Sequence, residues 1–317
     1  MFPPKIGAGF EGLRHNAGDF SYCIPMPSLA PPLFDRSAAP AGPAAPSRQA
    51  ARPYLVFMRT GAGGLYPRWL AQEAGRNWDL FLSAYVPLPS DPAAIATATG
   101  GYNKLEHFRD CVLSGQLDLS PYRRVLLADD DLEVTGGSIS AFFDCVERLG
   151  LAVSHPAQDW RGYWSLRIML RNPLAEWRET NFVEIMCPCF DTAFLARRLA
   201  DIPVTRSTWG SDHAFCHLAR ADGGQVGIVD TVVIRHVKPI QAAGAFYRKL
   251  SADGVVPADE LQAVLATLPP AEHAPRVIAI HVRPGALRGL RRGLAGLVEK
   301  KKRQIMKLFG HRQDRED

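Results

Sequence analysis

Short apolar segments alternate with helix-forming segments through much of the chain, and this alternation constrains the fold more than any other feature. The first predicted strands cover residues 54–60, 78–86 and 124–128. The predicted helices between and after them cover residues 66–74, 104–113 and 138–149, and Ser138 is placed to cap the last one. Such alternation predicts parallel strands joined by crossover helices, as in nucleotide-binding α/β folds.

The second half of the chain follows a different pattern, with longer connections between its elements. Strands are predicted at 151–154, 164–170, 182–186 and 226–235, and helices at 191–199 and 211–221. Both halves together predict an α/β fold with a single mixed central sheet flanked by helices.

Composition divides the chain into three predicted parts. With 317 residues and 47% hydrophobic content, the chain can bury one large core or two small ones. Residues 28–53 are dominated by Pro, Ala, Ser and Gly without apolar periodicity. We therefore predict a poorly ordered arm over 1–53, a catalytic domain over 54–280 and a basic tail over 281–317.

The basic tail has the pattern of an amphipathic helix. From His281 to Asp317 there are eleven Lys or Arg residues against four Asp or Glu, a net charge of +7, which leaves −2 of the total +5 for the rest. Leucines in a 3-4-3 spacing between basic side chains favour an anionic membrane surface. A helix packed on the domain and a disordered tail are open alternatives, because four glycines weaken the helix.

The expected location is the cytoplasm, with possible peripheral attachment to the inner face of the membrane. No run of eighteen apolar residues occurs, and the first residues lack the pattern of a secretory signal. The six cysteines show neither CxxC spacing nor the density of a disulfide scaffold, so we expect them to be buried and reduced. Cys187 and Cys189 are an improbable metal clip, because a proline separates them and no second pair exists.

The strongest chemical motif is VLLADDDLEV, residues 125–134, in which an apolar strand runs directly into Asp129, Asp130 and Asp131. Ligands of open α/β sheets bind beyond the carboxyl ends of the strands, so these acids should face a site. Adjacent carboxylates repel one another unless a cation relieves them, and Mn²⁺ or Mg²⁺ accepts oxygen ligands. The alternative is an acidic turn that caps the helix beginning near Ser138.

A second motif, RSTWGSDHAFCHLA, contains Asp212 in the first turn of a predicted helix that Ser211 would cap. The helix dipole favours the ionised carboxylate there, and such a group could accept a proton from an attacking hydroxyl. Alternatively, Asp212 only completes the cap. His213 and His217 lie four residues apart without a zinc-protease glutamate, so we interpret them as residues of the polar helix face.

A third motif, VGIVDTVVIRHVKP, has Asp230 and His236 at even spacing in a predicted strand, on one face if the strand is regular. An imidazole at the strand's end could complete a metal site begun by the aspartates, although a structural histidine is the common case. The first loop, with Gly61, Gly63 and Gly64, matches neither GxGxxG nor the P-loop pattern.

Five blocks in this order resemble domain-of-unknown-function family 707, which is similar to outlying members of the GT-A glycosyltransferase superfamily. The blocks are ADDDLEV, LAVSHPAQD, FVEIMCPCF, WGSDHAF and VGIVDTVVIRH, within residues 54–240. The resemblance implies a GT-A-like nucleotide-diphospho-sugar transferase fold. It implies that Asp129 and Asp131 are the acids of a DxD motif with Asp130 between them, that Asp212 activates the acceptor, and that His236 binds the metal.

The resemblance also suggests weaker candidates. Lys104 matches a lysine of the family and would contact phosphate, and Thr60, with Arg59, lies in a loop that borders the nucleotide in GT-A sites. Glu184 is a candidate near the acceptor, because a lone carboxylate in an apolar segment is costly unless it faces a cleft or a partner. The chain departs from the family where Ala128 stands for a tryptophan and His155 for a glutamine.

We therefore expect a metal-dependent transferase that moves a sugar from a UDP- or GDP-sugar to a saccharide or lipid-linked acceptor. Two alternatives are a metal-dependent phosphohydrolase that uses the same aspartates, and a catalytically silent member that binds a sugar or a protein. A two-metal hydrolase would need further His or Asp ligands, and a silent member would be expected to lose the triplet or His236. No nucleic-acid partner is expected, because the domain has no platform of aromatic and basic residues.

Overall fold

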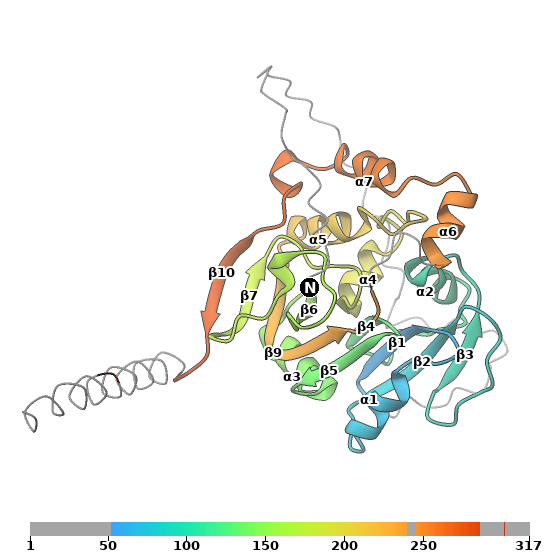
Figure 1. Ribbon diagram of the computed structural model, residues 1–317, viewed down its shortest axis with the longest axis horizontal. Helices are drawn as coiled ribbons and strands as arrows, with labels where there is room; N and C mark the ends of the chain where they lie inside the picture. The colour runs from blue at the N-terminus through green and yellow to red at the C-terminus, as the bar shows by residue number, and fades with distance from the viewer. Residues whose placement is uncertain (1–51, 240–244, 286–300, 302–317) are drawn as a thin grey trace, which may run out of the picture. The chain divides into compact units, whose positions relative to one another are not determined.

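The computed structural model describes residues 52–239 and 245–285 together with residue 301. They all belong to the larger of two compact units, residues 32–317. This part has the predicted α/β class, with one mixed sheet flanked by helices (Figure 1). The strands are β1 (Tyr54–Thr60), β2 (Trp78–Ala84), β3 (Ala96–Thr99), β4 (Arg124–Asp129), β5 (Leu132–Gly136), β6 (Val153–Gln158), β7 (Ala175–Thr180), β8 (Cys189–Asp191), β9 (Val226–His236) and β10 (Val277–Val282). The helices are α1 (Tyr66–Gln72), α2 (Lys104–Leu113), α3 (Ile139–Leu149), α4 (Thr192–Arg198), α5 (Ser211–Ala221), α6 (Ala245–Ala252) and α7 (Pro257–Leu265), with short 3₁₀ turns η1 (Arg167–Met169) and η2 (Pro270–Glu272).

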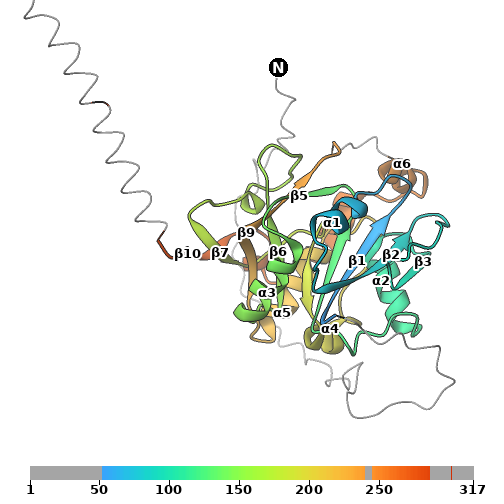
Figure 2. The same ribbon diagram turned by 90° about the horizontal axis from the view of Figure 1, so that it is seen from below.

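The described residues form one ten-stranded sheet in the order β10-β7-β9-β6-β8-β4-β1-β2-β3, and β5 pairs with β9. The strands β1 to β4 are parallel to one another, as Figure 2 shows side by side for β1, β2 and β3. The remainder is mixed, because β7, β5 and β8 pair in antiparallel fashion while β6 and β9 run parallel. The register of β4 with β1 places Asp129 opposite Arg59 at their carboxyl ends.

The sheet is buried on both faces, which explains why its central strands are continuous apolar runs. In β1, Leu55 and Phe57 belong to one core cluster, which also contains Phe108 of α2. Val56 belongs to the other cluster, which contains Trp69 of α1. Alternate side chains of one strand thus fill both layers of core.

Local sequence signals predicted several elements correctly. The helices α2 and α5 cover the predicted residues 104–113 and 211–221. Ser138 caps α3 as predicted, since its side chain accepts a hydrogen bond from the Ala141 amide at 3.0 Å. Ser211 does not cap α5: Gly210 occupies that position with a φ of 86°, and the Ser211 hydroxyl donates to the Pro203 carbonyl at 2.7 Å.

Two predicted strands are wrong. Residues 164–170 form irregular backbone, η1 and an isolated bridge at Leu170, and residues 182–186 form a loop that enters a turn. Their apolar side chains, such as Met169 and Val183, do pack in the core, but from irregular backbone. An apolar run reports burial rather than strand geometry, so the pattern was ambiguous.

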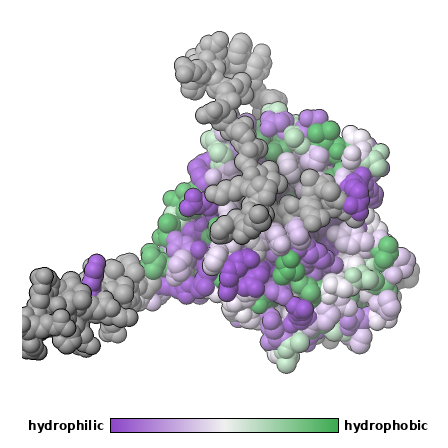
Figure 3. All heavy atoms as spheres, in the orientation of Figure 1, coloured by the Kyte–Doolittle hydropathy of each residue, from purple (hydrophilic) through white to green (hydrophobic). Residues whose placement is uncertain are grey.

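The strand β10 lies at an edge of the sheet and pairs with β7 alone among the described strands. It exposes aliphatic side chains, visible as green residues at the left of the body in Figure 3, namely Val277, Ile278, Ile280 and Val282.

The five described cysteines are free and buried, as predicted, and Cys23 lies outside the described residues. None of the described helices is long and apolar enough to span a bilayer. The predicted amphipathic pattern lies almost wholly outside the described residues.

Candidate active site

Asp129 ends β4 and is held by Lys104 at the start of α2. The Lys104 ammonium donates to Asp129 Oδ1 at 2.8 Å and to the Met186 carbonyl at 2.8 Å. Burial raises the pKa of Asp129, and the Lys104 charge opposes this rise. The Asp129 side chain is still 38% exposed, so it is crowded by protein but open to a ligand. Lys104 therefore orients the first acid, and its predicted contact with phosphate remains a prediction.

Asp130 organises the first loop. Its carboxylate accepts a hydrogen bond from the Gly61 amide at 2.9 Å, and its carbonyl accepts one from the Leu65 amide at 2.7 Å. A Cβ added at Gly64 would lie 2.2 Å from Thr60 Oγ1 and 3.0 Å from an Asp130 oxygen, so this close approach requires glycine. Thr60 is fully buried and its hydroxyl donates to the Gly61 carbonyl at 3.3 Å. The predicted contact of Thr60 with the donor gains no support from this placement.

Asp131 pairs with His236 across two antiparallel strands. The register of β5 with β9 sets Leu132 opposite His236, and Asp131 Oδ2 lies 3.2 Å from His236 Nε2. Burial lowers the pKa of His236, but the hydrogen bond and charge of Asp131 outweigh burial, so the pKa is raised. Burial likewise raises the pKa of Asp131, and the hydrogen bond with His236 brings it below the usual value. The structure thus brings together two predicted metal ligands that lie far apart in the sequence.

The Asp131–His236 pair also has unused binding capacity. Among the described residues, Asp131 Oδ1 and His236 Nδ1 are buried without a hydrogen-bond partner. A buried polar atom without a partner is costly, and such atoms often mark a place that a ligand completes. No group of three or more His, Cys, Asp or Glu side chains within the described ranges is arranged to hold a metal. The pair offers two ligand atoms, and the metal remains a prediction.

Asp230 does not join His236. Its carboxylate is fully buried, accepts from Arg178 Nε at 2.8 Å and accepts from the Asn172 amide at 2.6 Å. The register of β9 against β6 shifts between Val229 and Val233, so the even spacing does not hold along the strand. Asp230 is therefore a structural ion pair away from the candidate site.

Glu184 and Asp212 supply two further acids. Glu184 accepts a hydrogen bond from Gln158 Nε2 at 2.6 Å, and burial raises its pKa against that bond. The charges of His236 and Asp129 also act on Glu184. Burial raises the pKa of Asp212 to about 7, and the nearby charge of Glu184 adds to this rise. Electrostatic coupling thus links Asp212 through Glu184 to the aspartate run.

The turn before α5 is strained. Thr208 has a φ of 68°, and it is the one non-glycine residue with positive φ among those described. A β-branched residue rarely adopts this conformation, which costs about 1–3 kcal/mol. Gly210 follows with a φ of 86°, and a Cβ there would lie 2.8 Å from Val264 of α7. Strain of this kind clusters at functional sites, and this turn presents Trp209 and Asp212.

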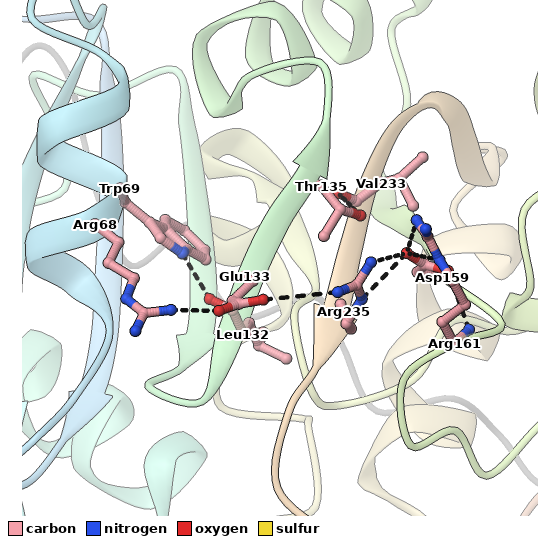
Figure 4. A network of polar contacts seen from close by, with 9 residues as sticks. All are labelled: Arg68, Trp69, Leu132, Glu133, Thr135, Asp159, Arg161, Val233 and Arg235. Atoms are coloured by element: carbon pink, nitrogen blue, oxygen red, sulfur yellow. Dashed lines mark hydrogen bonds and ion pairs between the residues drawn. The ribbon is translucent and has the colours of Figure 1, made fainter.

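A polar network of arginines and carboxylates, here called the outer brace, includes Arg235, which precedes His236 in the chain (Figure 4). Glu133 of β5 lies between Arg68 of α1 and Arg235 of β9. Arg235 Nη2 lies 2.7 Å from Asp159 Oδ2, and Arg161 also pairs with Asp159 at 2.8 Å. The hydrogen bond from Arg161 holds the pKa of Asp159 well below its usual range. The network ties α1, β5, β9 and the loop after β6 to one another.

The buried cation Arg59 lies at the carboxyl end of β1 and bonds to the end of β2, and the sequence indicated it only as a weak candidate for the donor site. Arg59 is 2% exposed and donates to Ser83 Oγ at 2.9 Å, and to the carbonyls of Gly100 at 2.6 Å and Gly101 at 2.9 Å. Its guanidinium lies 4.3 Å from the ring centroid of Tyr85. The signal was a charged residue within an apolar strand, which is costly unless it has partners. Arg59 therefore shapes the same edge of the sheet as Asp129.

A shallow pocket of about 190 Å³ lies beside α1 and β5, lined by Arg68, Trp69, Gln72, Glu133 and Val134. It coincides with the outer brace rather than with the free atoms of Asp131 and His236. Its carboxylate, Glu133, is already paired with Arg68 and Arg235. The chemistry is therefore expected at the aspartates and not in this pocket.

Comparison with known proteins gives distant structural similarity only. No protein-family model matches the sequence, and no curated protein matches it. Similar solved structures include TarS of S. aureus (10% identity, TM-score 0.43), TarS residues 1–349 with UDP-GlcNAc (11%, 0.44) and GalNAc-T7 with UDP, GalNAc and Mn²⁺ (11%, 0.44). The matches cover 69%, 68% and 68% of this chain and 44%, 64% and 51% of those chains. At such TM-scores the case for function rests on the site itself, and the resemblance to family 707 stays a prediction.

Proposed function

We propose that this chain is a glycosyltransferase of family 707 that transfers a sugar from a UDP- or GDP-sugar to a saccharide or lipid-linked acceptor. One observation carries the proposal: the pair of Asp131 and His236 has two unbonded ligand atoms and lies in one electrostatically coupled group with Glu184 and Asp212. A cation-binding end and a proton-accepting end in one site suit transfer from a charged donor to a hydroxyl.

The residues present fit a divalent cation. Asp131 and His236 would hold it, with Asp129 at the neighbouring strand end, and Asp130 holds the first loop beside them. Carboxylate and imidazole ligands suit Mn²⁺, and carboxylates with water suit Mg²⁺. When bound, the cation would neutralise charge on the diphosphate leaving group. The protein's own part is to orient these ligands, through Lys104 at Asp129 and through the outer brace at Arg235.

Asp212 is the proposed base. A pKa of about 7 leaves the carboxyl close to half ionised at neutral pH, which suits a group that must take up a proton. In the proposed step, the acceptor oxygen bonds to the anomeric carbon and the bond from that carbon to the diphosphate breaks. The acceptor proton passes to Asp212, and the bonding electrons leave with the diphosphate. Glu184, whose charge adds to the rise in the pKa of Asp212, is the proposed partner of acceptor hydroxyls.

The hydrolase alternative has weaker support. A two-metal phosphohydrolase needs ligands for two cations, whereas Asp131 and His236 offer two unbonded ligand atoms, with which a site for one cation can begin. A catalytically silent member would bind the nucleotide sugar without turnover, and assay separates it from an enzyme.

The proposed location depends on the tail. Residues 286–300 and 302–317 lie outside the described part, so attachment to an anionic inner membrane face rests on the sequence pattern. Five arginines and no acidic residue occur from His273 to Val298, which favours contact with anionic lipid.

A panel of UDP- and GDP-sugars, each with and without Mn²⁺, tests the proposal by thermal shift of the full chain. We expect one donor to raise the melting temperature only when Mn²⁺ is present, because binding to the native state stabilises it. The same donor should then be consumed, with release of the nucleoside diphosphate. If no nucleotide sugar shifts the melting temperature under either condition, the proposal is wrong.

A further inference from the structure

Two loops beside the candidate site expose aromatic rings. Trp160, Tyr163 and Trp164 follow β6 and are 74%, 42% and 40% exposed, and Trp209 precedes α5 and is 39% exposed. Large exposed rings are uncommon on a protein surface without a binding role. The exposed large hydrophobic residues of these two loops are all aromatic, whereas those of β10 are all aliphatic.

The first loop is fixed directly onto the site. The Tyr163 amide donates to the His236 carbonyl at 3.0 Å, and the Tyr163 ring meets the His236 ring edge-on with centroids 6.5 Å apart. The Ser165 side chain lies beside Glu184 and opposes the rise in the pKa of that carboxyl. Trp164, whose ring is exposed, stands between these two residues in the chain, which places its backbone beside the site.

The loop is also rigid at its base. A Cβ at Gly162 would lie 2.7 Å from Arg235 Cγ and 2.9 Å from the His236 carbonyl oxygen, so the backbone packs closely on β9. Asp159, at the start of the loop, is held by Arg235 and Arg161, as Figure 4 shows. Rings on a pre-ordered loop lose little conformational entropy when a ligand binds.

We infer that Tyr163 and Trp164, with Trp209 on the loop of Asp212, form the binding surface for a saccharide acceptor of two or more sugar units. The inference rests on the proposed function and narrows its acceptor from a saccharide or lipid-linked molecule to an oligosaccharide chain. The face of an aromatic ring carries partial negative charge and attracts the polarised C–H bonds of a sugar ring. The neighbouring carboxylates of Glu184 and Asp212 accept hydrogen bonds from sugar hydroxyls. The exposed large hydrophobic side chains of these loops are all aromatic, whereas Leu166, Ile168 and Val204 are only partly exposed, and this favours a sugar over a protein partner.

The strained turn supports the second part of the surface. Thr208 and Gly210, both with positive φ, flank Trp209 and set its position three residues before Asp212. A ring at this distance along the chain can border the acceptor that Asp212 would deprotonate. Trp209 therefore belongs to the acceptor side of the site by its place in the chain.

The test compares ring and non-ring substitutions in the full chain with UDP and Mn²⁺ present. A glycan array of defined oligosaccharides first selects the probe, and calorimetry then measures its binding to Trp164→Leu, Tyr163→Leu and Trp164→Phe. We expect each leucine variant to lose roughly tenfold or more in affinity for the oligosaccharide, while Trp164→Phe stays near the wild type, because phenylalanine keeps the aromatic face. Leu113→Ala, an exposed apolar change at the end of α2, is the control for surface hydrophobicity.

Two results would overturn the inference. One is an array on which the wild type binds no oligosaccharide, and the other is a leucine variant that binds the selected probe as the wild type does. UDP affinity, measured in parallel, tests the proposed function separately, and it should be unchanged in Trp164→Leu, Trp164→Phe and Leu113→Ala; Tyr163→Leu is left out of this comparison because Tyr163 contacts His236. If the wild type fails to bind UDP while oligosaccharide binding still depends on the rings, the saccharide surface stands and the transferase proposal fails.

Discussion

The two halves of the sheet contribute different parts of the candidate site. From β1 to β4 the strands are parallel, and the aspartates follow directly from the end of β4. From β5 onwards the sheet is mixed, and Glu184 and Asp212 come from a loop and from the first turn of a helix. The regular half thus supplies the aspartates, while His236, the proposed partner of Asp131 in cation binding, comes from β9 of the mixed half. The irregular half supplies the acids and rings that suit an acceptor.

The largest expected effect is a loss of turnover at the acceptor end of the site, with donor binding retained. We predict that Asp212→Asn lowers turnover roughly 10²- to 10⁴-fold while donor affinity stays within about threefold, because its proposed task is proton removal. Wild-type turnover should rise as the pH increases through about 7, since the carboxyl must be ionised to act. Steady-state kinetics across pH checks both statements.

Asp201→Asn is the matched control, because Asp201 is an exposed acid that pairs with Arg198 away from the site. It should leave kcat unchanged. Normal transfer by Asp212→Asn would show that Asp212 only serves the helix N-terminus and that the base lies elsewhere.

The second effect is a loss of stability, and it distinguishes an acid with a structural role from the acids of the candidate site within the irregular half. Asp230→Ala should lower the free energy of unfolding by about 3–5 kcal/mol, because it leaves the buried charge of Arg178 without its partner. Denaturant titration measures this loss. Below the unfolding transition, donor affinity should stay at the wild-type level.

The double variant Arg178→Met with Asp230→Leu should recover much of the lost stability, since it removes both charges. A loss of donor affinity in folded Asp230→Ala would mean that Asp230 contributes to the site after all.

A smaller effect concerns stability and pH at the acceptor end. Burial raises the pKa of Asp212 from 3.8 to about 7, so between these two pH values the folded state keeps a proton that the unfolded state has released. Stability from this group is therefore present at low pH and is lost as the pH rises towards 7. Asp212→Asn should raise the melting temperature by a few degrees at pH 8 and by less at pH 5. An equal change at both pH values would contradict the buried, raised carboxyl.

The smallest effect concerns the basic tail, which lies outside both halves of the sheet, and its association with membranes. Truncation after Pro284 should leave donor binding unchanged and reduce association with anionic liposomes, because the basic and apolar residues of the tail act together. Moderate salt should also weaken the association of the full chain by screening its charges. Flotation of both proteins at two salt concentrations tests this, and equal flotation would favour a tail that packs on the domain.

The sequence predicted what local patterns determine. The helix α2 has Asn103 as its cap, whose side chain accepts from the Glu106 amide, and such signals lie within four residues of the helix start. The aspartate run was found because the three acids are adjacent in the chain. His236 lies beside Asp131, and its role as a metal ligand, which its strand-end position and the resemblance to a known family suggest, remains a prediction.

Long-range contacts were beyond the reach of such patterns. The pairing of Lys104 with Asp129 joins residues 25 apart, and the coupling of Glu184 to Asp212 joins a loop to the first turn of α5. The predicted strand at 182–186 failed because buried coil and buried strand carry the same apolar signal. The role of Gly210 at the start of α5 required knowledge of its backbone angle and of its contact with Val264.

The most direct test of the account is calorimetric titration of UDP and of GDP into the wild type and Asp131→Ala, each with and without Mn²⁺. Asp131 lies at the end of the sheet beside His236 and outside the core, so the variant should fold normally by circular dichroism. The account predicts that one of the two nucleotides binds the wild type with Mn²⁺, that affinity falls without the cation, and that Asp131→Ala shows no dependence on Mn²⁺ and at least roughly tenfold weaker binding. Equal affinity in the folded variant, with and without Mn²⁺, would contradict a cation-assisted nucleotide site at the aspartate run.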